Sequence, residues 1–193
     1  MGDLFEGDPF GYGWKNTRSE KTHKREFQIA CILNDRLATN GMRAHRVPGN
    51  KYSPYDLEVI LYDWDSLTPG PVVCRIDVEE KPDRFKKKCV PDRWTRGVSF
   101  LVRKTQKEVN YDRDVYILSD CQPNYPRIIW AHYATIRDFG EYEDFGSRNR
   151  FLVVRKRNYD KLNFGFRSLV LWCIYLKNNE VTQPVRFHAE AAP

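Results

Sequence analysis

The residues of this chain that could carry out chemistry together are Asp56 and the run Glu79, Glu80 and Lys81. They lie at the outer ends of two segments, 55–62 and 72–81, which are rich in β-branched and aromatic residues and are therefore predicted to be strands. Residues 65–71 between them are dense in turn-forming types. The sequence thus predicts a β-hairpin with acids and a lysine at its open end.

A hairpin that folds back symmetrically about residues 67 and 68 would place Asp56 opposite Glu79. Lys81 would share a face with Glu79, because side chains two residues apart point to the same side of a strand. Two carboxylates and a lysine at one strand end are the components of a metal-dependent hydrolytic site. The alternative is an ordinary hairpin with a surface ion pair between Lys81 and one of the acids.

Hydrolysis of a phosphodiester requires neutralisation of the phosphate charge and a strong nucleophile, and a divalent cation supplies both. Mg²⁺ prefers oxygen ligands, which Asp56, Glu79 and the backbone carbonyl of Glu80 could provide. Mn²⁺ is expected to substitute. Lys81 could orient the attacking water or stabilise the developing negative charge. We therefore predict a magnesium site at the open end of the hairpin.

An amphipathic helix is predicted over residues 19–40, ending at Gly41. Its apolar stripe contains Ile29, Leu33 and Leu37, and Glu26 falls close to the centre of that stripe. A buried carboxylate is costly unless it has a partner or a role. A glutamate on this stripe is therefore unusual, and the simple alternative is that Glu26 lies in the first helical turn near solvent, where the helix dipole favours an acid.

This arrangement of Asp56, an apolar hairpin and Glu79-x-Lys81, preceded by a helix with Glu26, resembles the PD-(D/E)XK nuclease superfamily. The resemblance covers residues 19–120, and it departs from the motif in having Tyr55 between Pro54 and Asp56. It implies an α/β restriction-endonuclease-like core, with a central mixed β-sheet flanked by helices.

The resemblance also implies an enzyme, a Mg²⁺-dependent endodeoxyribonuclease that hydrolyses DNA through a Mg²⁺-activated water. Asp56 and Glu79 would be metal ligands, Lys81 the catalytic lysine and Glu26 an auxiliary acid. Compact members of this kind are often encoded by phages or mobile elements, and such enzymes often act as homodimers.

We expect residues 1–18 to form a flexible arm and residues 19–193 to form a single nuclease-like domain, with the motif-bearing core at about 19–120. Further strands are predicted over 98–104 and 114–119. Residues 127–136 are predicted to be a strand or a short helix. The patterns over 150–154 and 168–176 are apolar and do not distinguish strand from helix.

The chain has a formal net charge of +6, and its basic residues cluster. Such clusters suit a polyanionic partner, although a solvated surface is an equally simple interpretation. Arg103 and Lys104 stand at the end of the 98–104 strand, where one of them is predicted to contact the scissile or a neighbouring phosphate; the alternative is a solvated strand end. The basic clusters follow the hairpin at Lys86, Lys87 and Lys88, and lie near the C-terminus at Arg148, Arg150, Arg155, Lys156 and Arg157.

The five cysteines form no disulfide framework, and no signal peptide or membrane span is recognisable. These features predict a cytoplasmic protein, in the host cytoplasm if it is phage-encoded. Asp63 and Asp65 could bind a cation but are more simply turn formers. The rival functions are a non-catalytic nucleic-acid-binding module of the same fold and a protein-binding structural component.

Overall fold

The first helix of the computed structural model matches its predicted position. The structure describes residues 17–47, 55–80, 97–101, 109–120, 122, 126–144 and 150–181. Helix α1 spans Thr17–Leu37 and continues as a 3-10 turn, η1, over Ala38–Asn40. Gly41 follows with a φ of 61° and donates its N–H to the carbonyl of Ala38, a left-handed helix end that glycine adopts readily. Of the predicted arm, residues 1–16 lie outside the described residues.

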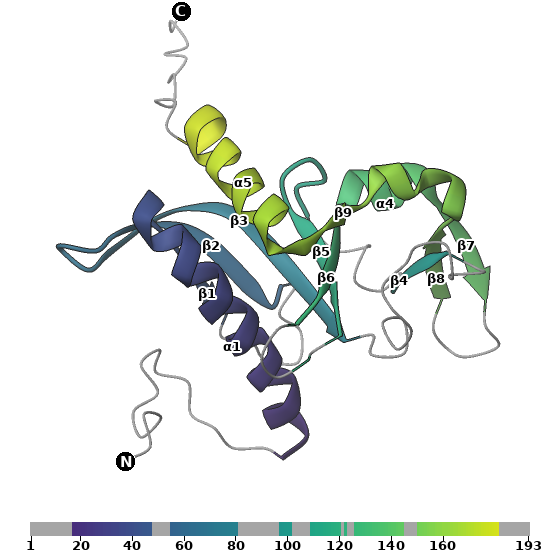
Figure 1. Ribbon diagram of the computed structural model, residues 1–193, viewed down its shortest axis with the longest axis horizontal. Coiled ribbons are helices and arrows are strands. Elements are labelled where there is room, and N and C mark those ends of the chain that lie inside the picture. Colours follow the sequence, from purple (N-terminus) through teal and green to yellow (C-terminus); the bar gives the residue numbers. More distant parts are fainter. Residues whose placement is uncertain are drawn as a thin grey trace, which may run out of the picture.

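A mixed sheet of six strands forms the centre of the described chain, in the order β1-β2-β3-β5-β6-β9. β3 and β5 are parallel, and the other neighbouring strands are antiparallel. Helices flank this sheet (Figure 1), which confirms the predicted α/β class. The strands are Met42–Arg46 (β1), Leu57–Asp63 (β2), Thr68–Glu80 (β3), Val115–Ser119 (β5), Ile128–His132 (β6) and Asn163–Phe164 (β9).

A second, smaller sheet has the order β4-β8-β7 and lies at the end of the molecule away from the β2–β3 hairpin (Figure 1). Its strands are Val98–Leu101 (β4), Gly140–Asp144 (β7) and Arg150–Val154 (β8). The remaining elements are helices α4 (Tyr133–Phe139) and α5 (Gly165–Leu176), the 3-10 segment η3 (Lys156–Lys161) and the π-helical turn η4 (Lys177–Val181).

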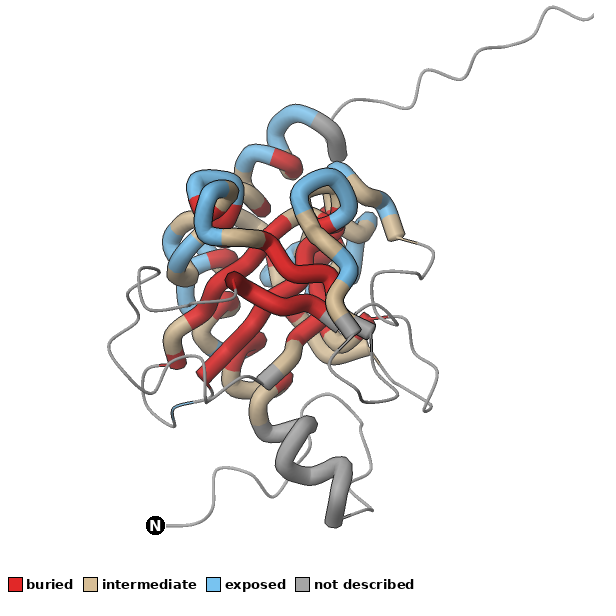
Figure 2. Tube along the Cα trace, turned by 90° about the vertical axis from the view of Figure 1, so that its right-hand side faces the viewer, coloured by how far each residue is buried: buried red, intermediate tan, exposed pale blue. Residues whose placement is uncertain are grey.

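The central sheet separates two hydrophobic cores, and its strands form the most buried part of the chain (Figure 2). One core joins α1 and α5 to one face of the sheet, with Leu33, Ile76 and Leu169 among its fully buried members. The other core joins the opposite face to the second sheet and α4, through residues such as Tyr116 and Phe100. Since successive side chains of β3 alternate between faces, burial of Ile76 in the first core directs Asp77 to the opposite face.

The tip of the hairpin differs from the prediction. Asp63 pairs with Thr68, so the turn occupies residues 64–67, and Pro69 and Gly70 belong to β3 rather than to a turn. The pairing of β2 with β3 also contains register shifts near Ile60. These shifts move the symmetry point of the hairpin toward the N-terminus, which changes the residue that faces Asp56.

Two strand predictions are confirmed in position, as far as the structure describes those residues. Residues 98–101 form β4, which pairs with β8 in the second sheet and not with the hairpin. The 127–136 segment is both a strand and a helix, because β6 ends at His132 and α4 begins at Tyr133. Residues 150–154 are a strand and 168–176 are helical, whereas β1, β7 and β9 are not predicted by the sequence patterns above.

None of the described helices combines the length and the hydrophobicity that crossing a bilayer requires.

Candidate active site

Strand β3 places two acids side by side on one face of the central sheet. Ile76 and Val78 belong to the core beneath α1 and α5, so Asp77 and Glu79 point to the other face. In the parallel register of β3 and β5, Asp77 lies beside Tyr116 and Glu79 lies beside Leu118. The face that carries both acids is therefore the one that packs toward the second sheet.

Asp56, the residue that precedes β2, lies beside the acidic end of β3. Its N–H donates to the carbonyl of Ile76 at 3.1 Å, and its Oδ2 accepts the N–H of Val78 at 2.7 Å. Leu57 pairs with Ile76, so Asp56 continues the register opposite Asp77 and not opposite Glu79. The predicted direct pairing with Glu79 is wrong, yet the carboxylate of Asp56 is bound to the backbone of the residue that precedes Glu79.

Two tyrosines from other elements bind the acids of β3. The Tyr116 hydroxyl, on β5, donates to Oε2 of Glu79. The Tyr133 hydroxyl, at the start of α4, donates to Oδ2 of Asp77. The two rings lie 6.0 Å apart between centroids. Each β3 acid on this face is thus held by a phenol from a strand or helix far along the chain.

Sequence reasoning missed Asp77, Tyr116 and Tyr133. Asp77 and Tyr133 are almost completely buried, at 0% and 1% exposure. Burial raises the pKa of Tyr133 well above its usual value, and the charge of Asp77 and its hydrogen bond raise the pKa further. The alternation of β3, which puts Asp77 on the face of Glu79, is the one signal that could have indicated this residue.

Glu26 lies well inside helix α1 and is buried, with 5% of its surface exposed. Its Oε2 accepts a hydrogen bond and ion pair from Nε of Arg46 at 2.5 Å. The interpretation as a solvated residue of the first turn is therefore wrong. Arg46 pairs with Leu57, the residue after Asp56. The ion pair therefore links Glu26 to the strand beside the candidate site. The role of Glu26 as an auxiliary acid stays a prediction.

Several predicted residues lie outside the described part of the chain. This holds for the residues Lys81, Lys86, Lys87, Lys88, Arg103 and Lys104, and for the side chain of Glu80. The C-terminal basic cluster is partly described, and there Arg155 and Arg157 both bind Glu141. Arg155 also bonds Glu143, so acids of β7 offset much of the positive charge that favoured a polyanion at this cluster.

The donor set at the end of β3 fits a hard divalent cation. Mg²⁺ in proteins often takes only one or two carboxylates, with water and substrate phosphate completing its shell. Asp56 and Glu79 are the two carboxylates that could hold such a cation, and the hydrogen bonds from the Val78 N–H and the Tyr116 hydroxyl orient them. No three His, Cys, Asp or Glu side chains gather as ligands within the described residues, so Asp77 is not counted as a third ligand.

The other acid pair that the sequence offered for a cation is a turn. Asp63 accepts the N–H groups of Asp65 and Ser66 and the hydroxyl of Ser66. These are the bonds of an Asx turn, which orders the hairpin tip. The turn interpretation of Asp63 is therefore confirmed.

No protein-family model and no curated protein matches this sequence. Among solved structures, the chain is similar to D212, a nuclease from a fusselovirus, with a TM-score of 0.52 and 10% sequence identity. The match covers 86% of this chain and 98% of that protein. The two proteins therefore share a fold across most of their length.

Proposed function

We propose that this protein is a Mg²⁺-dependent nuclease of the restriction-endonuclease-like PD-(D/E)XK type, and that it hydrolyses phosphodiester bonds in DNA. The observation that carries the proposal is the fixed position of Asp56 and Glu79 at one end of the β2–β3 hairpin. The shared fold with D212, described as a nuclease, supports the same class of activity.

In this proposal Asp56, Glu79 and the backbone carbonyl of Glu80 hold Mg²⁺, and Mn²⁺ can replace it. When bound there, such a cation would offset charge on the scissile phosphate and make a water more acidic. Lys81 lies two residues after Glu79 and orients the attacking water or stabilises charge as it develops. Tyr116 holds the Glu79 carboxylate in one orientation, so that it does not have to be ordered when substrate arrives.

The basic residues that follow the hairpin in sequence contact the substrate. Lys86, Lys87, Lys88, Arg103 and Lys104 bind phosphates away from the cleaved bond, which adds affinity without sequence preference. Cleavage of both strands of a duplex follows most simply if two copies of the chain act together. Sedimentation of the protein with and without DNA measures that pairing.

The test is cleavage of supercoiled, linear, branched and single-stranded DNA by the purified chain with Mg²⁺, with Mn²⁺ and with EDTA. Lys81→Ala is expected to lower the rate by about 10²–10³-fold, the usual effect of removing one transition-state donor. Asp56→Asn and Glu79→Gln are expected to abolish cutting. Asp138→Asn, which changes an exposed acid of α4, is the matched control and should cut normally.

The outcome identifies which function holds. Metal-dependent cutting that disappears in the site variants but not in Asp138→Asn supports the nuclease. Salt-sensitive DNA binding without cutting under either metal would replace it with the non-catalytic binding module. Absence of both activities in a folded protein would leave the structural component as the remaining interpretation.

A further inference from the structure

The face of the central sheet that carries Asp77 and Glu79 continues past the site onto β1 and β2. Met42 and Ala44 of β1 and Leu57 and Val59 of β2 lie in the core beneath α1 and α5. Their neighbours in sequence therefore point to the opposite face. This outer face of the first three strands carries Arg43, His45, Glu58, Tyr62 and Arg75.

At the hairpin end of this face an arginine lies against two aromatic rings. The guanidinium of Arg43 is 4.8 Å from the ring centroid of Tyr62 and 6.0 Å from that of Trp64. The two rings meet edge to face at 4.7 Å. Trp64 is 41% exposed, and the hairpin that carries it projects beyond the rest of the sheet (Figure 1). We call Arg43, Tyr62 and Trp64 the hairpin cluster.

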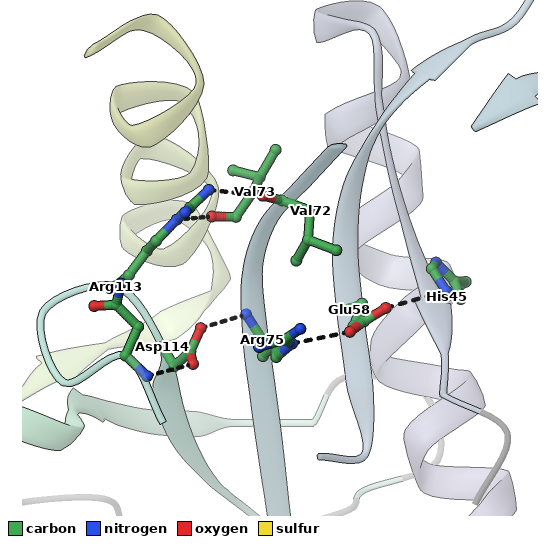
Figure 3. Close-up of polar contacts among 8 residues, drawn as sticks. His45, Glu58, Val72, Val73, Arg75, Arg113 and Asp114 are labelled. Atoms are coloured by element: carbon green, nitrogen blue, oxygen red, sulfur yellow. Dashed lines mark hydrogen bonds and ion pairs between the residues drawn. The ribbon is translucent and has the colours of Figure 1, made fainter. Parts of the chain in front are cut away.

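Between the hairpin cluster and the acids, charged side chains cross the strands in a row (Figure 3). Arg75 donates from Nε to Glu58 at 3.0 Å, and Nε2 of His45 lies 3.8 Å from the same carboxylate. Arg75 also covers the ring of Tyr55 at 4.8 Å. Arg75 partly neutralises the negative charge of Glu58. A phosphate chain that passes over this row is therefore repelled less by Glu58.

The row leads directly to the candidate active site. Arg75, Asp77 and Glu79 are every second residue of β3, so their side chains lie on the same face. From Tyr62 back to Asp56 the chain spans about 20 Å at the usual rise of a strand. A stacked nucleic-acid strand advances about 3.4 Å per nucleotide, so this distance corresponds to about six nucleotides.

We propose that the hairpin cluster binds an unpaired stretch of nucleic acid that flanks the bond cleaved at Asp56 and Glu79. The proposal rests on the proposed function and adds the class of substrate, a duplex with a single-stranded tail. Exposed aromatic rings beside arginine bind unpaired bases by stacking, whereas bases inside a duplex have no free face for such contacts. A tail of about six nucleotides reaches from the site to Tyr62 of the hairpin cluster.

The test measures DNA binding in EDTA, so that the result does not depend on cleavage. A labelled duplex carries 5′ or 3′ single-stranded tails of graded length, and fluorescence anisotropy gives the dissociation constant for each. The wild-type chain should gain affinity once the tail of one polarity reaches about six nucleotides. Trp64→Ala and Arg43→Ala should each lose that gain, with binding of the long-tailed DNA about tenfold weaker.

The matched controls come from the same hairpin. Leu67→Ala changes an exposed apolar side chain, 67% accessible, on the same turn and should bind like the wild type. Trp64→Phe retains a stacking ring and should recover most of the affinity. Blunt duplex should bind Trp64→Ala and the wild-type chain equally.

The outcomes separate this inference from the proposed function. A tail-dependent gain lost in Trp64→Ala supports the hairpin cluster even if no metal restores cutting, in which case only the nuclease proposal fails. Equal binding of tailed DNA by folded Trp64→Ala and the wild type overturns the cluster, whether or not the chain cuts DNA. A change of oligomeric mass in Trp64→Ala, with unchanged DNA binding, would reassign the cluster to contact between copies of the chain.

Discussion

The carboxylates of Asp56, Asp77 and Glu79 are each oriented by a hydrogen-bond donor from another segment of the chain. The backbone of Val78 donates to Asp56, the phenol of Tyr116 to Glu79 and the phenol of Tyr133 to Asp77. A carboxylate oriented in this way loses little further freedom when it binds a cation, which is how outer partners raise metal affinity. A phenol of ordinary pKa is already protonated at neutral pH, and burial raises the pKa of Tyr133 further, so that it remains a donor into more alkaline solution.

Tyr116→Phe removes the donor to Glu79 while leaving the ring in place. We expect the Mg²⁺ concentration for half-maximal cleavage to rise about tenfold, with much of the rate recovered at saturating Mg²⁺. A titration of initial cleavage rate against Mg²⁺ measures this shift. Tyr142→Phe, at an exposed position of β7, is the control. An unchanged Mg²⁺ titration in Tyr116→Phe would show that this hydroxyl does not position Glu79.

At the scale of elements, β4 and β8 approach each other very closely within the second sheet. Gly97, just before β4, has a φ of 106°, and a Cβ built on it would lie 2.4 Å from the carbonyl oxygen of Val154. No side-chain rotation can relieve this contact, because a Cβ is fixed by the backbone of its own residue and the atom it meets is a backbone oxygen. Glycine is therefore the residue type at position 97 that allows β4 and β8 to pair this closely.

Gly97→Ala should therefore lower the free energy of unfolding by about 2 kcal/mol or more, from left-handed strain together with the clash. Gly165→Ala is the matched control, since Gly165 also has a positive φ, 77°, but open space around its Cβ position. The control should cost only about 1 kcal/mol. Urea denaturation compares the two variants, and equal losses would contradict a backbone clash at Gly97.

The packing of α5 on β6 encloses His132 between two tryptophans. Its ring lies 5.2 Å from that of Trp130 and 4.4 Å from that of Trp172. Burial lowers the pKa of His132 below its usual 6.5, with the charge of Asp112 acting weakly in the opposite direction. The folded state therefore prefers the neutral imidazole, while the unfolded chain takes up a proton at its ordinary pKa.

The sign of the resulting pH dependence follows from linkage. The contribution of His132 is fully present above pH 6.5, and it is lost as the pH falls from there through the lower folded-state pKa. His132→Gln should show a shallower loss of stability over this acidic range. Because the pKa of His45 is also lowered by burial, His45→Gln should remove a further part of the slope. Denaturation midpoints at a series of pH values measure it, and an unchanged slope in His132→Gln would contradict the assignment.

At the scale of the whole molecule, the candidate site joins segments that are distant in sequence. Asp56 precedes β2, Glu79 lies on β3, Tyr116 on β5 and Tyr133 on α4. A ligand bound by such a set binds the folded chain in preference to the unfolded one. Binding of Mg²⁺ should therefore be coupled to global stability.

Mg²⁺ at about ten times its dissociation constant should stabilise the fold by about 1.4 kcal/mol, which raises the melting temperature by about 4 °C. Scanning calorimetry at matched ionic strength measures this shift. Asp56→Asn should lose it and Asp138→Asn should keep it. The same increase in Asp56→Asn would place the stabilising cation somewhere other than the candidate site.

The local elements of the fold could be predicted because local residue periodicity governs them. The apolar stripe of α1, its end at Gly41, the two arms of the hairpin and β5 all follow from patterns within single segments. β1 was beyond this reasoning because it is short, and its basic residues obscure the alternation of Met42 and Ala44. The helical state of residues 168–176 was undecided because one apolar run suits either a buried strand or a buried helix.

By itself, the sequence determined that Asp56 and Glu79 stand at the open end of a β-hairpin and that a helix with Glu26 on its apolar stripe precedes this hairpin. Only the tertiary structure decided that Asp56 faces Asp77, that Arg46 binds Glu26, and that tyrosines from β5 and α4 hold Asp77 and Glu79. The physical reason is that register shifts and contacts between distant segments depend on how the two cores pack, which no local pattern of residues encodes.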